Sequence, residues 1–317
     1  MKDTDVKIQL GLTHDSDDWG FVWFPEFKFK APIETDARPL YGPKNLGKLF
    51  RRFMNEMPKY VNKASALGGA WVGPIFDKKF FDLTDAEEDY MTFSTFSMDG
   101  EEGFPGNLDL TVIYTFSNEN ELKIDYSATT DKKTLVNLTH HAFFSLSGLA
   151  NPTASVENNI VTINADWYTP VDETCIPLGE IAPVEGTPMD FRTPHTVGER
   201  INDYSFRQLE IGKGYDHCYV LNKREAGSLS YAAKCVEPIS GRYLEMWTTE
   251  PGVQLYTANW LSGFEGYKGA TFPERSAICF EAQHFPDTPN KGHFPSCVLT
   301  PGNEYKQVTI YKFGVEK

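Results

Sequence analysis

The sequence lacks the features that mark a membrane protein or a secreted protein. No apolar run reaches about 18 residues, so no stretch is long enough for a membrane-spanning helix. The amino terminus, MKDTDVKIQLG, has no long apolar core of the kind that a secretory signal needs. The five cysteines are widely spaced and form no C-x-x-C pair, which is typical of a reduced chain. These absences predict a cytoplasmic protein without a membrane partner.

Basic residues are few relative to acidic ones. The 317-residue chain has 30 lysines and arginines against 44 aspartates and glutamates, which gives a formal net charge of −14. Nucleic acids and anionic membranes bind proteins through basic patches, so neither is expected as a partner. The sequence also has no P-loop, no G-x-G-x-x-G turn and no G-x-S-x-G elbow, and the chemistries that use these motifs are weak candidates.

What the sequence does have is a period-two alternation of apolar and polar residues. It begins with LDLTVIYTF (108–116), continues after a turn signal, SNEN, with ELKIDYSATT (121–130), and recurs towards the carboxy terminus. Many strands with long loops and few helices predict an all-β fold, a large antiparallel sandwich. The further strand candidates are VNLTHHAFFSL, SVENNIVTINA, SLSYAAKCV, RYLEMWTT, VQLYTANWL, SAICFEAQHF and KQVTIYKF.

Two adjacent histidines lie in one of these segments, NLTHHAFFSLSG (137–148). Neighbouring residues on a strand point to opposite faces, so His140 and His141 should have different surroundings. The other residues on the face of His140 are apolar, whereas the face of His141 is polar apart from Phe143. We therefore expect His141 to line a cleft and His140 to lie on the core side or at its edge. The alternative, that both histidines are structural and hydrogen-bonded, stays open at this point.

A glutamate in the middle of another strand candidate, ICFEAQHF (278–285), is the second unusual feature. Buried carboxylates need partners, so an ion pair with an arginine is one explanation of Glu281. The other explanation is catalytic, because a carboxylate and an imidazole on inner strand faces make a general base and a general acid. A metal site is not expected, because the adjacent His140 and His141 cannot readily share one ion on a strand. No third ligand has a convincing spacing either.

Six segments between about residue 97 and the carboxy terminus together carry a family resemblance. They are GEEGFPGNLDLTVIYTF, NLTHHAFFSLSG, WYTPVDETCIPLGEIAPVEGTPMDFR, GYDHCYVL, PGVQLYTANW and FEAQHFPDTPNKGHFPSCVLTPGNEYKQVTIYKF. They resemble the aldose 1-epimerase (galactose mutarotase) family. The resemblance implies one β-supersandwich domain over residues 1–317, with few short helices and neither a metal nor an organic cofactor. It also implies a monosaccharide partner, a monomer or weak dimer, and interconversion of the α and β anomers of hexoses.

The same resemblance implies roles for individual residues. His141 matches the histidine that ends the family's N-L-T-N-H motif, which is the general acid, and His140 replaces the usual asparagine. Glu281 matches the general base. Asp216, in GYDH, matches a contact to sugar hydroxyls, and Gln254, in PGVQ, matches a further sugar contact. Glu281 would take the proton of the C1 hydroxyl while His141 protonates the ring oxygen, and the opened ring would then close on its other face.

The first part of the chain, residues 1–96, departs from the family pattern. DVKIQLGLTHDSDDW resembles a segment that family members carry only after their first strands, so the opening strands are missing on that alignment. Residues 45–61 are the best helix candidate by apolar spacing. A second interpretation aligns part of them with the family's arginine-containing segment, which retains Arg52 and Asn55 as expected substrate contacts.

Two sugar-binding side chains of the family are replaced on this alignment. Glu56 stands where the second arginine belongs, and Leu67, in SALGGAWVG, stands where a histidine belongs. A lost polar contact typically costs about 1–3 kcal/mol, so we expect a hexose anomerase of the glucose or galactose class with a weakened or altered sugar preference. A non-catalytic carbohydrate-binding or regulatory protein is one alternative. Another is an enzyme for a modified, for example phosphorylated, sugar that uses Lys48, Arg51 and Arg52 as an anion site.

Overall fold

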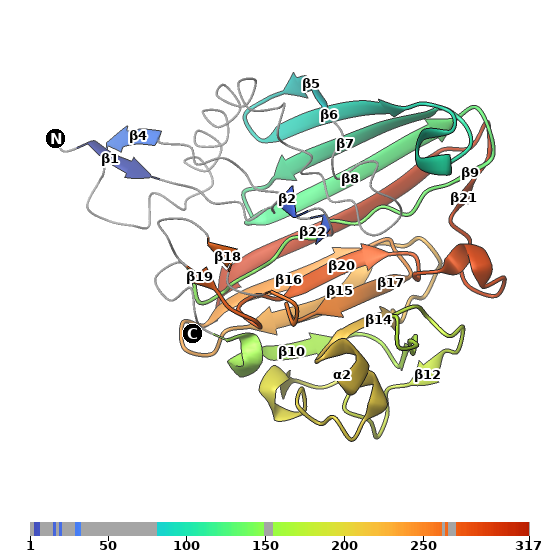
Figure 1. Cartoon of the computed structure of the whole chain (residues 1–317). Helices are drawn as coiled ribbons and strands as arrows, with labels where there is room; N and C mark the ends of the chain where they lie inside the picture. Colours follow the sequence, from blue (N-terminus) through green and yellow to red (C-terminus); the bar gives the residue numbers. More distant parts are fainter. Residues whose placement is uncertain are drawn as a thin grey trace. The chain divides into compact units, whose positions relative to one another are not determined.

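The computed structural model describes residues 81–148, 155–261 and 271–316, together with the backbone of five short strands (Figure 1). These strands are β1 (Asp3–Val6), β2 (Asp15–Ser16), β3 (Trp19–Gly20), β4 (Phe29–Pro32) and β18 (Phe264–Glu265). β1 pairs with β4, β2 with β3, and β18 with β19 (Thr271–Phe272). The helix predicted over 45–61 lies outside the described residues.

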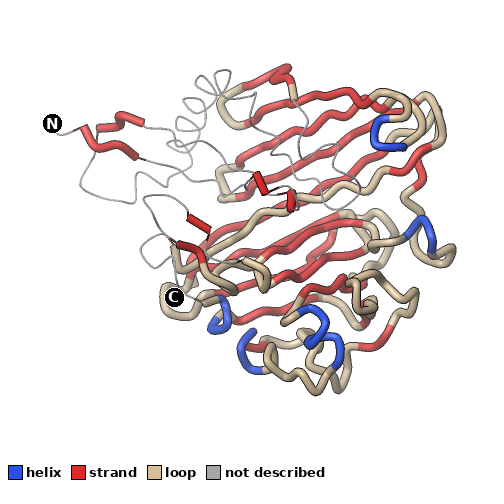
Figure 2. The backbone as a smooth tube through the Cα atoms, viewed as in Figure 1, coloured by secondary structure: helices blue, strands red, loops and turns tan. Residues whose placement is uncertain are grey.

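Strands make up most of the regular structure of the described part (Figure 2). Among these residues α2 (Arg207–Gly212) is the one α-helix, and neither it nor any other described helix is long and apolar enough to cross a membrane. The strand pairs whose register is described are antiparallel. The prediction of an all-β antiparallel fold is therefore confirmed. The described residues also form four single-turn 3₁₀ helices: Glu101–Gly103, Val156–Asn158, Val197–Glu199 and Thr288–Asn290.

The chain divides into two compact units. Residues 1–134 and 299–306 form the first unit, and residues 135–298 and 307–317 form the second. The organisation as one domain stays a prediction. Four strands form an antiparallel meander in the first unit: β5 (Asp82–Ala86), β6 (Tyr90–Ser97), β7 (Leu108–Phe116) and β8 (Glu121–Thr130).

The strands β7 and β8 have the bounds that the alternation predicted. Their apolar residues meet across the pair, with Leu110 opposite Ala128 and Val112 opposite Tyr126, and all four side chains are buried. At the turn between the strands Asn120 has a φ of 61°, a left-handed conformation that asparagine tolerates better than most residues. A clean alternation joined by a suitable turn residue is therefore sufficient to define this hairpin.

Two antiparallel sheets build the second unit. The strand order is β13, β10, β15, β16, β22 in one sheet and β12, β11, β14, β17, β20 in the other. The first contains β13 (His195–Thr196), β10 (Ile160–Ile163), β15 (Ser230–Val236), β16 (Arg242–Thr248) and β22 (Tyr305–Val315), which belongs to this unit from residue 307 onward. The second contains β12 (Ala182–Pro183), β11 (Trp167–Tyr168), β14 (Asp216–Val220), β17 (Gly252–Tyr256) and β20 (Cys279–Gln283). β9 (Thr134–Leu135) and β21 (Val298–Leu299) are short strands outside these sheets.

Side chains of β22 connect the two sheets of the second unit. The hydroxyl of Tyr311 donates to the backbone carbonyl of Phe280 at 2.8 Å, and the amide of Gln307 donates to the carbonyl of Ala282 at 3.0 Å. Both carbonyls belong to β20, an outer strand of its sheet whose one neighbour within the described part of the chain is β17. Buried carbonyls need such partners, so these bonds fix β20 to the neighbouring sheet.

The segment around the two histidines is not the strand that the sequence predicted over 137–146. Its one described bridge joins Phe144 to Ile278. Side-chain hydrogen bonds replace the ladder, since the amide of Asn137 donates to the carbonyl of His284 at 3.1 Å and its oxygen accepts the backbone N–H of His284 at 2.9 Å. A segment with an alternating sequence can therefore be irregular, provided that its backbone and side chains form hydrogen bonds to a neighbouring segment.

Candidate active site

Three neighbouring strands, β14, β17 and β20, carry three of the residues that the sequence singled out (Figure 1). β17 lies between the other two. Directly opposed residues, and residues two apart on one strand, project from the same face of a sheet. Asp216, Gln254 and Glu281 therefore share a face. In register, this face has one row of Asp216, Tyr256 and Cys279 and a second row of Cys218, Gln254 and Glu281.

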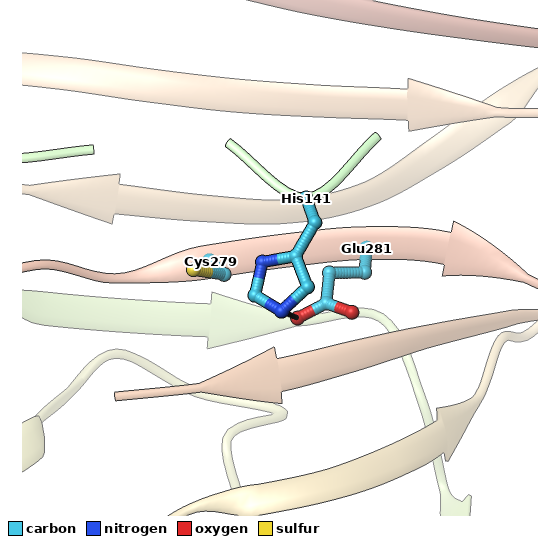
Figure 3. Close-up of side chains that lie close together, drawn as sticks. All are labelled: His141, Cys279 and Glu281. Atoms are coloured by element: carbon cyan, nitrogen blue, oxygen red, sulfur yellow. Dashed lines mark ion pairs between the residues drawn. The ribbon is translucent and has the colours of Figure 1, made fainter. Parts of the chain in front are cut away.

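The imidazole of His141 lies beside the carboxylate of Glu281 (Figure 3). Nε2 of His141 is 3.4 Å from Oε1 of Glu281, and the two side chains are 16% and 5% exposed. The imidazole ring stacks on Phe143, with centroids 5.0 Å apart, and meets the ring of Tyr256 edge-on at 6.0 Å. Within the described residues, the side chain paired with Glu281 is thus a histidine and not the arginine considered from the sequence.

The His141 segment is attached to β20 on both sides of the pair. Asn137 makes its two hydrogen bonds to His284 on one side, and Phe144 bridges Ile278 on the other. Tyr311 approaches the same segment, with its hydroxyl 3.4 Å from the carbonyl of His140. These contacts set the position of His141 relative to Glu281, because they connect the backbones that carry the two side chains.

Burial shifts the pKa of both members of the pair towards the uncharged form. It lowers the pKa of His141 to about 4 and raises the pKa of Glu281 well above its usual value, with the Asp216 carboxylate adding to the rise. A neutral imidazole beside a protonated carboxyl holds as many protons as an imidazolium beside a carboxylate. The pair can therefore pass from its neutral to its ionic form by moving one proton from Glu281 to His141.

Asp216 and Gln254 form a second polar pair on the same face. Nε2 of Gln254 donates to Oδ1 of Asp216 at 2.8 Å. Burial raises the pKa of Asp216 to about 6, and hydrogen bonds from Gln254 and Trp260 oppose that rise. At neutral pH this carboxyl is therefore ionised, and a carboxylate can accept hydrogen bonds from the hydroxyls of a polyol.

His140 has surroundings quite different from those of His141. It is 6% exposed, and its ring lies 5.5 Å from the ring of Tyr311. Burial, followed by the neighbouring His141, lowers the pKa of His140 to about 3, so its imidazole is neutral at physiological pH. The structure thus places His140 on the buried side and His141 beside Glu281, as the alternation of faces predicted.

The remaining residues that the sequence singled out are not part of the described site. Arg52, Asn55, Glu56 and Leu67 lie outside the described residues, as do Lys48 and Arg51. Their roles stay predictions.

Sequence reasoning missed Tyr256 and Cys279. The alternation of strand residues could have found them, because residues two apart project from the same face. Tyr256 lies two residues from Gln254, and Cys279 lies two residues from Glu281. The thiol of Cys279 also joins the nitrogen of His141 and the carboxylate of Glu281 in the one group of possible metal ligands among the described residues.

Known proteins resemble the chain over most of its length. A model of the aldose 1-epimerase family matches residues 55–312. The chain belongs to the aldose 1-epimerase family. Human galactose mutarotase is 43% identical over 224 residues, which make up 70% of this chain and 62% of the human protein. The aldose 1-epimerase of Haemophilus influenzae is 31% identical over 321 residues, 93% of this chain and 91% of that protein. The matched part is thus less than two thirds of the human relative's length.

Solved structures of family members share the fold. An aldose epimerase homologue from C. elegans has a TM-score of 0.67 at 28% identity, over 77% of this chain and 72% of that chain. The galactose 1-epimerase of Lactobacillus acidophilus has a TM-score of 0.64 at 28% identity, over 76% of this chain and 68% of that chain. The predicted β-supersandwich of the galactose mutarotase type is therefore confirmed.

Proposed function

We propose that this protein is an aldose 1-epimerase that interconverts the α and β anomers of a hexose. The observation that carries the proposal is the pairing of His141 with Glu281, whose Nε2 and Oε1 atoms are 3.4 Å apart. Opening and closing a pyranose ring requires a base at one oxygen of the anomeric carbon and an acid at the other. Relatives named galactose mutarotase and aldose 1-epimerase support this reaction.

In the proposed mechanism the reactive form of the pair is ionic. Glu281, as a carboxylate, takes the proton of the C1 hydroxyl while His141, as an imidazolium, protonates the ring oxygen. The bond between C1 and the ring oxygen breaks, and the C1 oxygen becomes an aldehyde. The pair is then neutral, which is the form that burial favours, so the site suits the open-chain intermediate. Rotation about the C1–C2 bond and reversal of both proton transfers give the other anomer.

We propose that Asp216 and Gln254 hold the sugar for this reaction. The hydrogen bond between them fixes the Asp216 carboxylate on the same sheet face as Glu281. A fixed acceptor for sugar hydroxyls keeps the reacting oxygens within reach of the acid and the base. Arg52 and Asn55 are proposed as further sugar contacts. Leu67, where the family has a histidine, is expected to weaken or alter sugar preference.

The state of the cysteines and the net charge support a proposed compartment and proposed partners. All five cysteines are free, which suits a cytoplasmic protein. We propose a monomer or weak dimer whose partner is a monosaccharide of the glucose or galactose class. The strongly acidic composition supports the absence of nucleic-acid and anionic-membrane partners. Proton transfer between His141, Glu281 and the sugar requires no organic cofactor or metal.

Anomeric equilibration tests the proposal directly. Freshly dissolved α-glucose or α-galactose is followed by polarimetry or by the NMR signal of the C1 proton, with and without micromolar protein. We expect the approach to equilibrium to accelerate in proportion to protein concentration. An unchanged rate with both sugars would contradict the proposal for these substrates. Sugar binding without acceleration, seen by calorimetry, would instead identify a non-catalytic carbohydrate-binding protein.

A further inference from the structure

Three different kinds of ligand atom converge at the proposed acid–base pair. Cys279 and Glu281 are two residues apart on β20 and project from one face, and His141 approaches that face from a separate segment (Figure 3). The imidazole nitrogen, the thiol sulfur and a carboxylate oxygen all lie within 4.8 Å of one another. The sequence did not show this grouping, because its members come from segments far apart in the chain.

The spacing suits a four-coordinate transition-metal ion. Zn²⁺ binds nitrogen and oxygen ligands at about 2.0–2.2 Å and thiolates at about 2.3 Å, so tetrahedral ligands lie about 3.3–3.7 Å apart. The 3.4 Å between His141 and Glu281 is already in that range. The sulfur of Cys279 lies within 4.8 Å of both partners and therefore needs to approach by about 1 Å at most.

We propose that His141, Cys279 and Glu281 bind a thiophilic divalent cation such as Zn²⁺, and that the bound ion inhibits the enzyme. A thiolate and an imidazole favour Zn²⁺ over Mg²⁺ and Ca²⁺, which prefer oxygen ligands alone. The ion would occupy the nitrogen and the carboxylate that transfer protons to and from the sugar. The inhibitory half of the proposal rests on the proposed function, whereas the binding half does not.

Coordination exchanges protons for the ion without changing the charge of the buried face. The thiol of Cys279 loses its proton when the sulfur binds, since the thiolate is the metal ligand. The proton that His141 and Glu281 hold between them leaves as well. One doubly charged ion therefore enters as two protons leave. This exchange limits the cost of placing a cation among side chains that are largely shielded from water.

Cobalt(II) tests the binding half without reference to activity. Thiolate-to-cobalt charge transfer gives a near-ultraviolet absorption band that oxygen and nitrogen ligands do not give. Titration of the full chain with Co²⁺ is expected to produce this band with one equivalent bound, and Zn²⁺ is expected to remove it. Cys279→Ser should abolish the band. Cys218→Ser, which changes another thiol on the same sheet face outside the group, should retain it.

Two results of the cobalt titration would overturn the site. One is the absence of a band in the unaltered protein, and the other is a band that persists in Cys279→Ser. Circular dichroism checks that each variant is folded. If Cys279→Ser does not fold, His141→Ala serves in its place and should weaken Co²⁺ binding by at least about tenfold. Unchanged Co²⁺ affinity in that variant would equally contradict the proposal.

Kinetics test the inhibitory half. Zn²⁺ is expected to slow anomeric equilibration, a chelator is expected to restore it, and Mg²⁺ at the same concentration should have no effect. The Zn²⁺ concentration for half-inhibition, relative to each variant's own metal-free rate, should rise at least about tenfold in Cys279→Ser but not in Cys218→Ser. A cobalt band in a protein without anomerase activity would contradict the proposed function but would still support the ion site. Full activity with the ion bound would overturn inhibition alone.

Discussion

At the scale of the residue, the site combines two side chains that burial keeps uncharged. His141 and Glu281 each lose solvation, yet the proton that one lacks is held by the other. From the sequence, alternation placed His141 on the polar face of its segment, and the family resemblance separately named His141 and Glu281 as acid and base. The sequence could not predict the protonation state, which depends on burial and on Asp216, a residue from another strand.

Removing either member of the pair should abolish most of the activity. Each proton transfer is typically worth about 10²–10⁴ in rate, so Glu281→Gln and His141→Asn should each lower kcat by such a factor. Polarimetry on α-glucose or α-galactose measures the loss. His293→Asn, which changes an exposed histidine outside the site, is the matched control and should retain activity. Full activity in either site variant would refute the assigned role.

The dependence of kcat on pH should have a broad plateau. At low pH His141 accepts a proton while Glu281 is still protonated, which leaves no base, so kcat should fall as the pH drops through about 4. At high pH the pair loses its proton and has no acid, so kcat should fall above the raised pKa of Glu281. Stopped-flow polarimetry, corrected for the uncatalysed rate, measures the profile. An acid limb near the ordinary histidine pKa of about 6.5 would contradict the inferred burial effect.

Asp216 should affect affinity before it affects turnover. Its pKa is raised to about 6, so its charge is lost as the pH falls from 7 to 5. Hydrogen bonds to charged groups are worth about 1.5–3 kcal/mol, so the protonated form should bind the sugar weakly. Since the ionised fraction of Asp216 falls about tenfold over this interval, KM should rise by up to about tenfold while kcat stays near its plateau. Initial rates at several sugar concentrations separate the two constants. Asp216→Asn should have a high KM that no longer changes in this interval, and a KM that still changed there would refute the assignment.

At the scale of the element, the position of His141, the proposed acid, depends on an irregular segment and not on a strand. The sequence predicted β7 and β8 to the residue, because a clean alternation ends at turn residues. It overextended the segment around His141, because the same alternation arises when side chains such as Asn137 replace ladder hydrogen bonds. A local sequence pattern does not show which distant segment a strand candidate pairs with, so it cannot distinguish these two cases.

Asn137→Ala should impair turnover more than sugar affinity. The variant loses both hydrogen bonds to the backbone of His284, and small displacements of catalytic groups can cost about 10²-fold in rate. We therefore expect kcat to fall by about 10- to 100-fold with a much smaller change in KM. Asn303→Ala removes the side chain of an exposed asparagine in a turn and serves as the control. Equal changes in kcat for both variants would refute a positioning role for Asn137.

Replacing Gly252 in β17 by alanine should destabilise the protein, because there is no room for a methyl group. An added Cβ would lie 2.8 Å from Sγ of Cys218 and 2.9 Å from the ring of Phe285, in a buried part of the sheet. Overpacking of this kind costs about 1–3 kcal/mol, so Gly252→Ala should lower the free energy of unfolding by that amount in urea denaturation. Gly292→Ala meets no atom within 4 Å and should change it by less than about 0.5 kcal/mol. Similar stability of the two variants would contradict the close packing.

At the scale of the whole molecule, noncovalent packing carries the fold. All five cysteines are free, and four of them are buried. A native disulfide typically contributes about 2–5 kcal/mol, which would appear as a shift of several degrees in Tm. We therefore expect the same Tm, by calorimetry, with and without a reductant such as dithiothreitol. A lower Tm under reducing conditions would show that a disulfide contributes to the native state.

The hydroxyl of Tyr311 has a consequence for when the proposed site is assembled during synthesis. It reaches the carbonyl of His140, 171 residues earlier in the chain, and the carbonyl of Phe280 in the strand that carries Glu281. Closing loops of such length costs entropy that only the finished contacts offset. A nascent chain that has not yet released β22 from the ribosome therefore lacks these bonds to the segments of His141 and Glu281. The proposed acid and base are therefore held together late in synthesis, once β22 has reached the segments that carry them.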